Sequence, residues 1–365
     1  MIVDFHHHWT PREFIKQDPG DQLILAYDEN GAPSYTTHKL LFDMEEHIRM
    51  MDTAGIDVAV MSSASGMSAD LERSRFVNDK AKQLEKDFPK RFIGYAHVNP
   101  LGGPEALKEL NRCAQDYGFP GVTITSEQDG LYLDAPEFEP FWSECAKLGL
   151  FVFVHPALKL NESKQFDAYD LARSVGREFS LIMATIRLIN SGVFDRHPNL
   201  VVQMSHLSGG IASMMGRVRA YQDKVFWGTK GNPRHGALPQ NDFDYYINNN
   251  LLFDSGGFCG VMGCVQTALV EIPASRLLFG TDYLYIALNQ LLSFQYIIIR
   301  FQTRDIDRAI WVAISEWEVE IELRVFHRCI FIQDLDDGLA LFAHEAPLCI
   351  KRIIMVAHAT DEGFE

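Results

Sequence analysis

Residues 1–9 read MIVDFHHHW, and this stretch decides the fold and supplies the first part of the candidate site. Its β-branched and aromatic residues are typical of a strand. Later runs of the same kind are DVAVMSS (57–63), FIGYAHV (92–98), GVTITS (121–126), LFVFVHP (150–156), LVVQMSHL (200–207), NLLFDSG (250–256) and LLFGTDY (277–283). These runs are nearly continuous in apolar residues rather than alternating, which predicts parallel strands covered on both sides.

The segments between these runs have helical character. They include residues 43–55, 68–88, 104–118 and 135–149, and the third has proline at its start and glycine at its end, the usual asymmetry of helix ends. Strand and helix therefore alternate through an α/β chain, which predicts a (β/α)8 TIM barrel. A doubly wound open sheet also alternates, but it usually carries a glycine-rich phosphate loop after its first strand, where this chain has histidines.

Two segments do not fit a plain barrel. LILAYDENGAPSYTT (23–37) places two strand-like runs around the turn pair Asn30-Gly31, which predicts a small β-hairpin inserted after the first strand, within about residues 22–40. Only two of the 26 glycines lie after residue 284. We therefore expect a barrel over residues 1–284 and an atypical C-terminal tail, helical or irregular, over residues 285–365.

Composition narrows the class of protein. The chain of 365 residues is 47% hydrophobic with a formal net charge of −16, which argues against global disorder and against nucleic acid or an anionic membrane as a partner. Its six cysteines are scattered without a CxxC pair, no secretory signal precedes the first strand, and no apolar run is long enough to span a bilayer. We expect a soluble, cytoplasmic protein.

Chemistry in a parallel barrel lies at the carboxyl ends of its strands. Here these ends carry His6, His8, His155, His206 and Asp282. Side chains alternate along a strand, so His6 and His8 should point the same way and could share one metal ion with His155 and Asp282. Three imidazoles and a carboxylate suit zinc, iron or manganese, and His206 would act as acid or base beside the metal.

The other histidines have simpler explanations. His7 should face away from the metal and pack, and His97 at the end of the third strand is as compatible with a structural position as with the pocket. We expect no metal-binding role for the four in loops and helices, which are His38, His47, His197 and His235. A purification tag is excluded, because three histidines are too few and lie inside a strand-like run.

Several motifs together resemble the amidohydrolase superfamily. These are DFHHH, FVHP, MSHLSGG and LLFGTDY, and the stretches INSGVFDRHPNLVVQMSHLSGG and MMGRVRAY are similar to the branch of aminocarboxymuconate-semialdehyde decarboxylase and related aromatic-acid decarboxylases. The resemblance covers residues 1–284. It implies that His6, His8, His155 and Asp282 bind one divalent metal, usually zinc, and that His206 is catalytic. It also implies that Arg217 binds a substrate carboxylate, reaching across the interface of a homodimer.

The chain departs from the branch at two positions. The branch has a substrate-binding arginine where this chain has SYTTHKLLFD, with Lys39 nearby, and its terminal helix around an Asn-Ala pair is missing from the tail. Binuclear amidohydrolases place a bridging lysine in the fourth strand, and GVTITSE has none, which predicts a mononuclear site. Glu127 is the nearest candidate for a second metal, and we expect it to lie too far along its loop.

The resulting functional prediction is a metal-dependent carboxy-lyase. Protonation of the carbon that bears the carboxylate would release carbon dioxide from an unsaturated or aromatic acid, with His206 and Asp282 as catalytic residues and no organic cofactor. We expect Trp9, Arg12 and Phe258 as pocket walls, although packing or surface charge would explain them equally well. The same site could hydrolyse a lactone or amide or hydrate a double bond, and a catalytically inactive metal-binding barrel is the non-enzymatic alternative.

Overall fold

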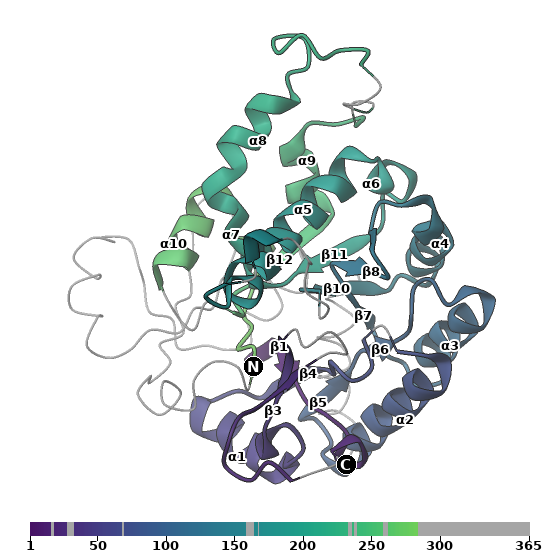
Figure 1. Cartoon of the computed structure of the whole chain (residues 1–365). Helices are drawn as coiled ribbons and strands as arrows, with labels where there is room; N and C mark the ends of the chain where they lie inside the picture. Colours follow the sequence, from purple (N-terminus) through teal and green to yellow (C-terminus); the bar gives the residue numbers. More distant parts are fainter. Residues whose placement is uncertain are drawn as a thin grey trace.

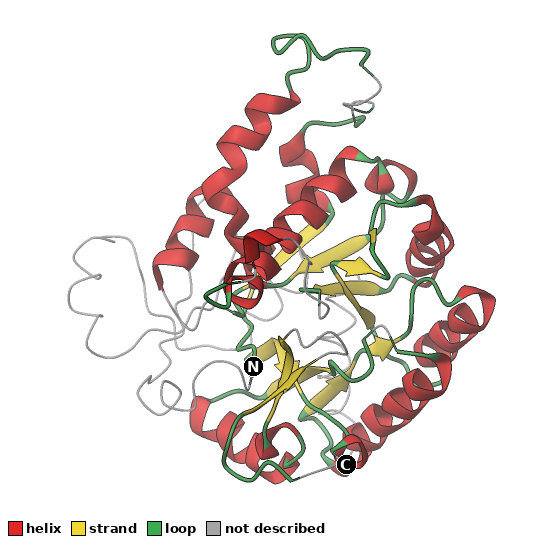
Figure 2. Cartoon of the chain, in the orientation of Figure 1, coloured by secondary structure: helices red, strands yellow, loops and turns green. Residues whose placement is uncertain are grey.

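The computed structural model describes residues 1–283 except residues 16–17, 28–32, 68, 158–163, 167, 233–235, 237–238 and 258–261. Strands lie in the centre of the molecule and helices lie outside them (Figures 1 and 2). The strands of the barrel are β1 (Val3–His8), β4 (Val58–Ser62), β5 (Phe92–Gly94), β6 (Ala96–His97), β7 (Gly121–Thr125), β10 (Phe151–His155), β11 (Val201–Met204), β12 (Leu251–Asp254) and β13 (Leu277–Leu278).

All pairings between these barrel strands are parallel. The order is β1-β4-β5 in one ladder and β6-β7-β10-β11-β12-β13 in the other. β5 and β6 form one strand position that is interrupted at Tyr95, whose amide donates to the carbonyl of Met61 at 3.2 Å. Every run that the sequence predicted as a strand contains one of these positions, and the predicted (β/α)8 barrel is confirmed.

The barrel closes where its first strand meets its last. The amide of Phe5 donates to Phe279 at 2.9 Å, and the amide of His8 donates to Tyr283 at 2.9 Å. His7 and Tyr283 form a parallel bridge. We call this junction, residues 4–8 with residues 279–283, the seam. Because the seam joins the first strand of the barrel to the last, it brings His6 and Asp282 together.

Two apolar clusters hold the barrel. Alternate strand residues such as Phe5, Val60 and Phe153 fill its interior, and the other faces pack against the helices in a larger cluster. The helices are α1 (Met44–Ala54), α2 (Leu71–Asp87), α3 (Gly103–Gln115), α4 (Glu139–Leu148), α5 (Arg177–Asn190), α6 (Val193–Arg196), α7 (His206–Gly210), α8 (Met215–Gln222), α9 (Phe243–Asn249) and α10 (Met262–Glu271). None of the helices in the described residues is both long and apolar enough to cross a membrane.

Helix ends follow their sequence signals. Asp43 caps α1 by accepting from the amide of Glu46 at 3.1 Å, and Gly55 ends this helix in the left-handed conformation with φ 71°. Asp70 caps α2 in the same way, through the amide of Arg73. These local signals explain why the spacers between strands form helices with definite ends.

Two short strands follow β1 in the segment where the sequence predicts an inserted hairpin. They are β2 (Ile24–Tyr27) and β3 (Pro33–Thr37), and they pair antiparallel with Ile24 opposite Thr37. The predicted turn at Asn30-Gly31 lies outside the described residues, as does the predicted extension over residues 285–365. A second small hairpin, β8 (Glu127–Gln128) with β9 (Leu131–Tyr132), follows β7 and was not predicted.

Candidate metal centre

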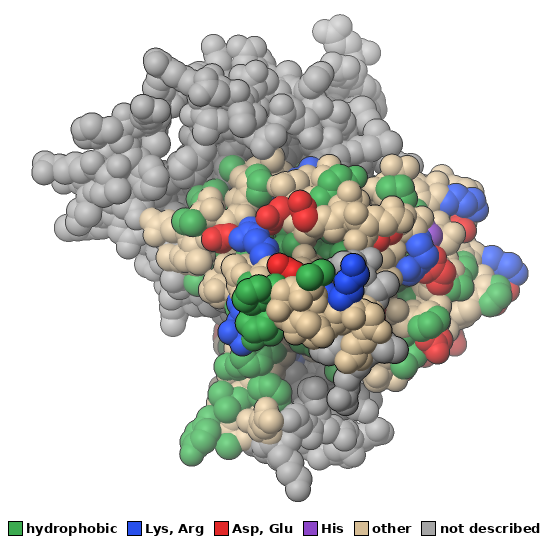
Figure 3. Space-filling view, turned by 90° about the horizontal axis from the view of Figure 1, so that it is seen from above, with side chains coloured by type: hydrophobic (Ala, Val, Ile, Leu, Met, Phe, Trp, Pro, Cys, Tyr) green, Lys and Arg blue, Asp and Glu red, His purple; other side chains and the backbone are tan. Residues whose placement is uncertain are grey.

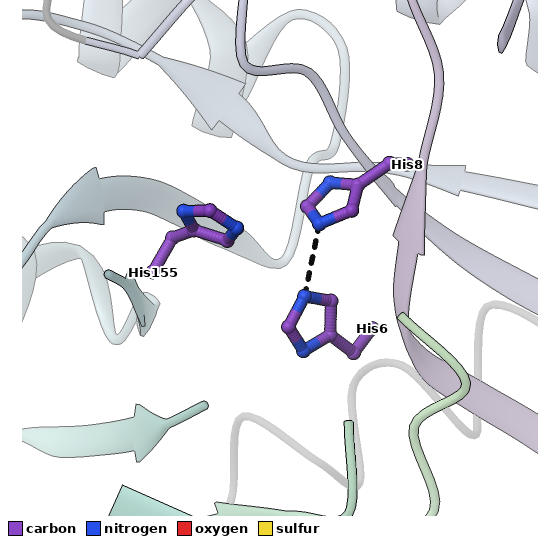
Figure 4. Close-up of side chains that lie close together, drawn as sticks. All are labelled: His6, His8 and His155. Carbon is purple, nitrogen blue, oxygen red and sulfur yellow. Dashed lines mark hydrogen bonds between the residues drawn. The ribbon is translucent and has the colours of Figure 1, made fainter. Parts of the chain in front are cut away.

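Three buried histidine rings converge at the carboxyl end of the barrel. His6 and His8 come from β1, and His155 ends β10 across the barrel (Figure 4). The Nε2 atoms of His6 and His8 lie 3.0 Å apart, and ligand atoms of all three rings lie within 4.8 Å of one another. Strand alternation therefore predicted the orientation of His6 and His8 correctly.

Asp282 and His206 complete the cluster. Asp282 Oδ1 lies 3.4 Å from His6 Nε2 and 3.1 Å from His8 Nε2, while its Oδ2 lies 3.4 Å from His206 Nε2. His6, His206 and Asp282 form a second group whose ligand atoms are mutually close. The structure thus brings together all five residues that the strand ends suggested, and the two possible metal-binding groups of the described residues share His6.

Partners behind the rings fix which nitrogen faces the centre. The Nδ1 atom of each ring contacts an atom outside the cluster: His6 to Asp254 Oδ1 at 2.9 Å, His8 to Ser62 Oγ at 3.0 Å, His155 to the Pro156 carbonyl at 2.9 Å, and His206 to Glu178 Oε1 at 2.8 Å. A carbonyl or carboxylate oxygen can only accept, so His6, His155 and His206 donate from Nδ1. The Nε2 atoms then point toward the centre, where a neutral His6 or His155 presents a lone pair, as metal-ligating histidines do.

The charges of the cluster favour a cation. Burial raises the pKa of Asp282, but His6 and His206 more than offset this and hold it well below its usual range. Burial also opposes ionisation of Asp254, and His6 again outweighs it, so this pKa is lowered too. Two buried carboxylates are therefore ionised beside imidazoles, and a buried carboxylate needs a counter-charge.

Protons can supply part of this counter-charge. Burial lowers the pKa of His6, but Asp254 and Asp282 outweigh it and the net shift is upward. The pKa of His206 is raised well above its usual value, because Glu178 and Asp282 outweigh its burial. By contrast, burial holds the pKa of His155 well below its ordinary value, so this ring stays neutral.

The donor set fits a single divalent ion. Nitrogen ligands at about 2.0–2.1 Å from zinc are roughly 3 Å apart when adjacent, which matches the His6–His8 separation. Asp282 Oδ1 is buried and accepts no hydrogen bond from the described part of the chain. Glu127 lies in the β8 hairpin and belongs to neither possible metal-binding group.

Backbone strain is concentrated at two of these residues. His206 has φ 54° and Asp282 has φ 52°, in the left-handed region that non-glycine residues rarely adopt. His206 does not end its strand as the sequence suggested, because β11 stops at Met204 and His206 opens a turn of left-handed residues. A Cβ on Gly257 would lie 2.4 Å from the His206 ring, so only glycine allows this close approach.

Sequence reasoning missed the residues behind the rings. Asp254 lies in the predicted strand NLLFDSG (250–256), but no role was predicted for it, and Glu178 on α5 and Ser62 on β4 were not considered. Position at a strand end was a usable signal for Asp254 and Ser62. Glu178 lies 28 residues before His206 on a helix, and only the packing of α5 against the turn after β11 brings them together.

The third histidine of the run lies on the opposite face of β1. His7 contacts Asp4 Oδ2 at 2.9 Å through Nδ1 and His47 Nδ1 at 3.0 Å through Nε2, and it stacks on Tyr283 with ring centroids 4.6 Å apart. His47 Nε2 contacts the Leu40 carbonyl, which can only accept. Burial and the charge of His7 hold the pKa of His47 well below its usual value, so its Nδ1 accepts from His7.

Three further histidines in the described part of the chain have partners outside the cluster. His97 Nε2 accepts from the amide of Ser63 at 2.8 Å, and burial lowers the pKa of His97 to about 3. His38 accepts from the amide of Leu40 at 3.1 Å, and His197 pairs with Glu139 at 2.8 Å. His235 lies outside the described residues.

The three residues expected to line the substrate pocket, Trp9, Arg12 and Phe258, differ in their surroundings. Trp9 is buried directly after His8, and its indole nitrogen finds no partner in the described structure. Arg12 pairs with Asp18 at 3.5 Å and lies over the Phe42 ring, half exposed. Phe258 lies outside the described residues.

Arg217 and Lys39, the basic residues considered for binding a substrate carboxylate, lie outside the histidine cluster. Arg217 is exposed on α8, where it contacts Tyr221, and α8 extends away from the barrel in Figure 1. The structure does not place Arg217 among the histidines of the same chain. Lys39 pairs with Asp21, so it does not stand in for the missing arginine in this arrangement.

Comparisons with known proteins identify the family of the chain. A family profile described as "Amidohydrolase" matches residues 3–311. Gamma-resorcylate decarboxylase of Rhizobium sp. (strain MTP-10005) is 32% identical over 266 residues, covering 67% of this chain and 78% of the relative. The 2-amino-3-carboxymuconate-6-semialdehyde decarboxylase of Dictyostelium discoideum is 31% identical, covering 60% of this chain and 66% of the relative.

Solved structures give the same result. A crystal structure of 2,6-dihydroxybenzoate decarboxylase from Rhizobium is 25% identical with a TM-score of 0.65, covering 80% of this chain and 90% of that one. At the level of fold, a dihydroxybenzoic acid decarboxylase from Polaromonas sp. JS666, solved with manganese and 2-nitroresorcinol, has a TM-score of 0.64 at 23% identity, covering 80% and 89%. The resemblance stated from the sequence is confirmed, and the chain belongs to the amidohydrolase family.

Proposed function

We propose that the chain is a metal-dependent, non-oxidative decarboxylase of an aromatic or unsaturated carboxylic acid. The observation that carries the proposal is the cluster of His6, His8, His155 and Asp282 at the carboxyl end of the barrel, in two groups of possible metal ligands that share His6, with His206 in the second group. The relatives named as decarboxylases support the reaction class. Hydroxylated benzoates and carboxymuconates are accordingly the substrates to test.

The proposed ligands are His6, His8, His155 and Asp282, and the ion is divalent. Bound there, zinc or manganese would supply Lewis-acid polarisation of a substrate oxygen. Asp254, Ser62 and the Pro156 carbonyl orient the three histidine rings toward the ion. Such outer partners fix the tautomer and orientation of a ligating ring.

His206 is the proposed acid. Its raised pKa keeps it protonated, and Glu178 holds its Nδ1 so that Nε2 faces the centre. Donation of this proton to the ring carbon that bears the carboxylate gives a carbon with four single bonds. The bond to the carboxylate then breaks, its electron pair returns to the ring, and carbon dioxide leaves. The hydrogen replaces the carboxylate, so no oxidant or organic cofactor is consumed.

Trp9, Arg12 and Phe258 are the proposed pocket residues, and Arg217 the proposed anchor for a carboxylate in a partner copy of a homodimer. Exposed apolar side chains at the end of α8 and beyond suit such an interface, among them Tyr221, Val225, Phe226 and Trp227. Figure 3 shows apolar and charged side chains interspersed on the face seen from above. Sedimentation of the protein, with Phe226→Asp as the variant expected to dissociate it, tests the dimer.

The test of the reaction is release of carbon dioxide from 2,6-dihydroxybenzoate and from 2-amino-3-carboxymuconate semialdehyde. Protein loaded with Zn²⁺ or Mn²⁺ should turn over one of them, and His206→Ala should not while keeping its metal. Lactones and amides form a second panel. Turnover of that panel alone would replace decarboxylation by hydrolysis, and no turnover of either panel by metal-loaded protein would sink the enzymatic proposal.

A further inference from the structure

Asp4 is a fully buried carboxylate at the seam that is not among the proposed ligands. Its Oδ1 accepts from the backbone amides of His6 at 3.1 Å and Thr281 at 2.9 Å. Its Oδ2 accepts from His7 Nδ1 at 2.9 Å and from the Thr281 hydroxyl. Asp4 therefore ties β1 to the segment that carries Asp282, through both of its oxygens.

β1 is irregular at this carboxylate. Asp4 pairs with Ala59 and His7 pairs with Met61, so three steps along β1 match two steps along β4. This is the signature of a β-bulge, which re-aims side chains. By plain alternation Asp4 would share the face of His6, but the histidine ring that its carboxylate contacts is that of His7. Phe5 meanwhile packs in the barrel interior, and the His6 ring reaches the cluster of ligands.

The other side of the seam is equally constrained. Thr281 directly precedes Asp282, whose amide donates to the His6 carbonyl at 2.8 Å. The Thr281 hydroxyl also accepts from the amide of Tyr283 at 3.2 Å. Asp282 is held with φ 52°, a strained conformation for a non-glycine residue that persists only where surrounding contacts enforce it. The bonds from Asp4 to Thr281 are contacts of this kind.

We propose that Asp4 is a positioning residue that sets the geometry of the metal centre from outside it, by fixing the bulge that aims His6 and the turn that aims Asp282. The proposal rests on the metal centre of the proposed function. Asparagine at this position keeps the shape but turns one acceptor into a donor that faces other donors. Asp4→Asn should therefore misplace ligands on both sides of the seam without removing any of them.

The experiment is titration of chelator-treated protein with Zn²⁺ by calorimetry, and with Co²⁺ by visible absorption, which reports ligand geometry. Asp4→Asn should weaken Zn²⁺ binding by about 10- to 100-fold, the usual cost of losing an outer partner, and should alter the Co²⁺ spectrum. Thr281→Val, which removes one donor, should act in the same direction, and Thr281→Ser should restore the wild-type result.

Asp57→Asn is the matched control. Asp57 also accepts from a backbone amide, that of Ile2 directly before β1, but at the opposite end of the strand from the histidines, so the variant should bind as wild type does. Wild-type affinity and spectrum in folded Asp4→Asn would overturn the inference alone. Wild-type protein that binds no metal would overturn the proposed function together with it. If Asp4→Asn does not fold, Thr281→Val decides, and wild-type binding by that variant overturns the inference.

Discussion

On one face of β1, His7 has both ring nitrogens matched within the protein, to Asp4 and to His47. On the other face, His6 and His8 direct Nε2 atoms at each other across 3.0 Å, with Asp282 beside both. Donors and acceptors balance on the His7 face. The face of His6 and His8 gathers lone pairs and a carboxylate. The difference shows how neighbouring, equally buried histidines can serve structure and chemistry separately.

The largest effect should come from removing a histidine on the face of β1 that carries His6 and His8, and the effect should be on metal affinity. His8→Ala removes a proposed ligand, so Zn²⁺ affinity should fall by more than about 100-fold, beyond the loss expected from an outer partner. Metal content after dialysis and calorimetric titration measure this. His197→Ala, which removes a histidine paired with Glu139 outside the cluster, should keep full metal content. A His8→Ala protein that retains its metal would remove His8 from the ligand set.

Removing His7, on the opposite face of β1, should lower the stability of the fold instead. His7→Ala removes one buried partner from Asp4 and one from His47, which should lower the free energy of unfolding by about 2–4 kcal/mol. Urea denaturation measures the loss. The variant should still bind one metal ion per chain when the ion is supplied in excess. Loss of metal binding at unchanged stability would reverse the assignment of the two faces.

Glu178 tests whether the proposed acid depends on its partner. Glu178→Gln keeps a group near His206 Nδ1 but removes the charge that raises the pKa of His206. Turnover of the substrate should fall by roughly 10- to 100-fold, within the range that general acid catalysis contributes, while metal content stays unchanged. A shift of the pH–rate profile to lower pH should accompany the fall. An unchanged profile would separate Glu178 from catalysis.

The smallest expected effect is on the pH dependence of stability, and it comes from His97. This histidine is buried but uncharged, which adds a third case to the comparison of the two faces. Burial lowers its pKa to about 3, so below pH 6.5 the unfolded chain takes up a proton that the folded chain does not. His97 therefore contributes to stability above pH 6.5, and this contribution is lost as pH falls toward 3, at about 1.4 kcal/mol per pH unit.

Urea denaturation of the wild type and of His97→Gln between pH 7 and pH 5 measures this slope. Glutamine retains an acceptor for the amide of Ser63 but binds no proton. The stability difference between the two proteins should therefore shrink as pH falls. A difference that stays constant with pH would show that His97 has an ordinary pKa.

Much of this architecture follows from the sequence because its signals are local. Apolar runs predicted the strands, and alternation predicted that His6 and His8 face one side. The positions that escaped prediction depend on long-range packing. Glu178 meets His206 only after α5 docks against the turn that follows β11, and the bulge between Asp4 and His7 has no signal in the residues themselves. Arg217 was inferred from resemblance, and within one chain it lies apart from the histidines.

The seam also sets the order in which the protein can become functional. Asp4 and Thr281 are separated by 277 positions, so nearly the whole barrel must be synthesised before the bonds between them form. A nascent chain exposes its histidines early but lacks the carboxylate of Asp282 until the last strand emerges. An ion that needs both sides binds only the closed barrel, and such binding stabilises that state by mass action. Bound metal should therefore slow hydrogen exchange at β1 and β13 more than elsewhere, because it stabilises the pairing of the first and last strands of the barrel.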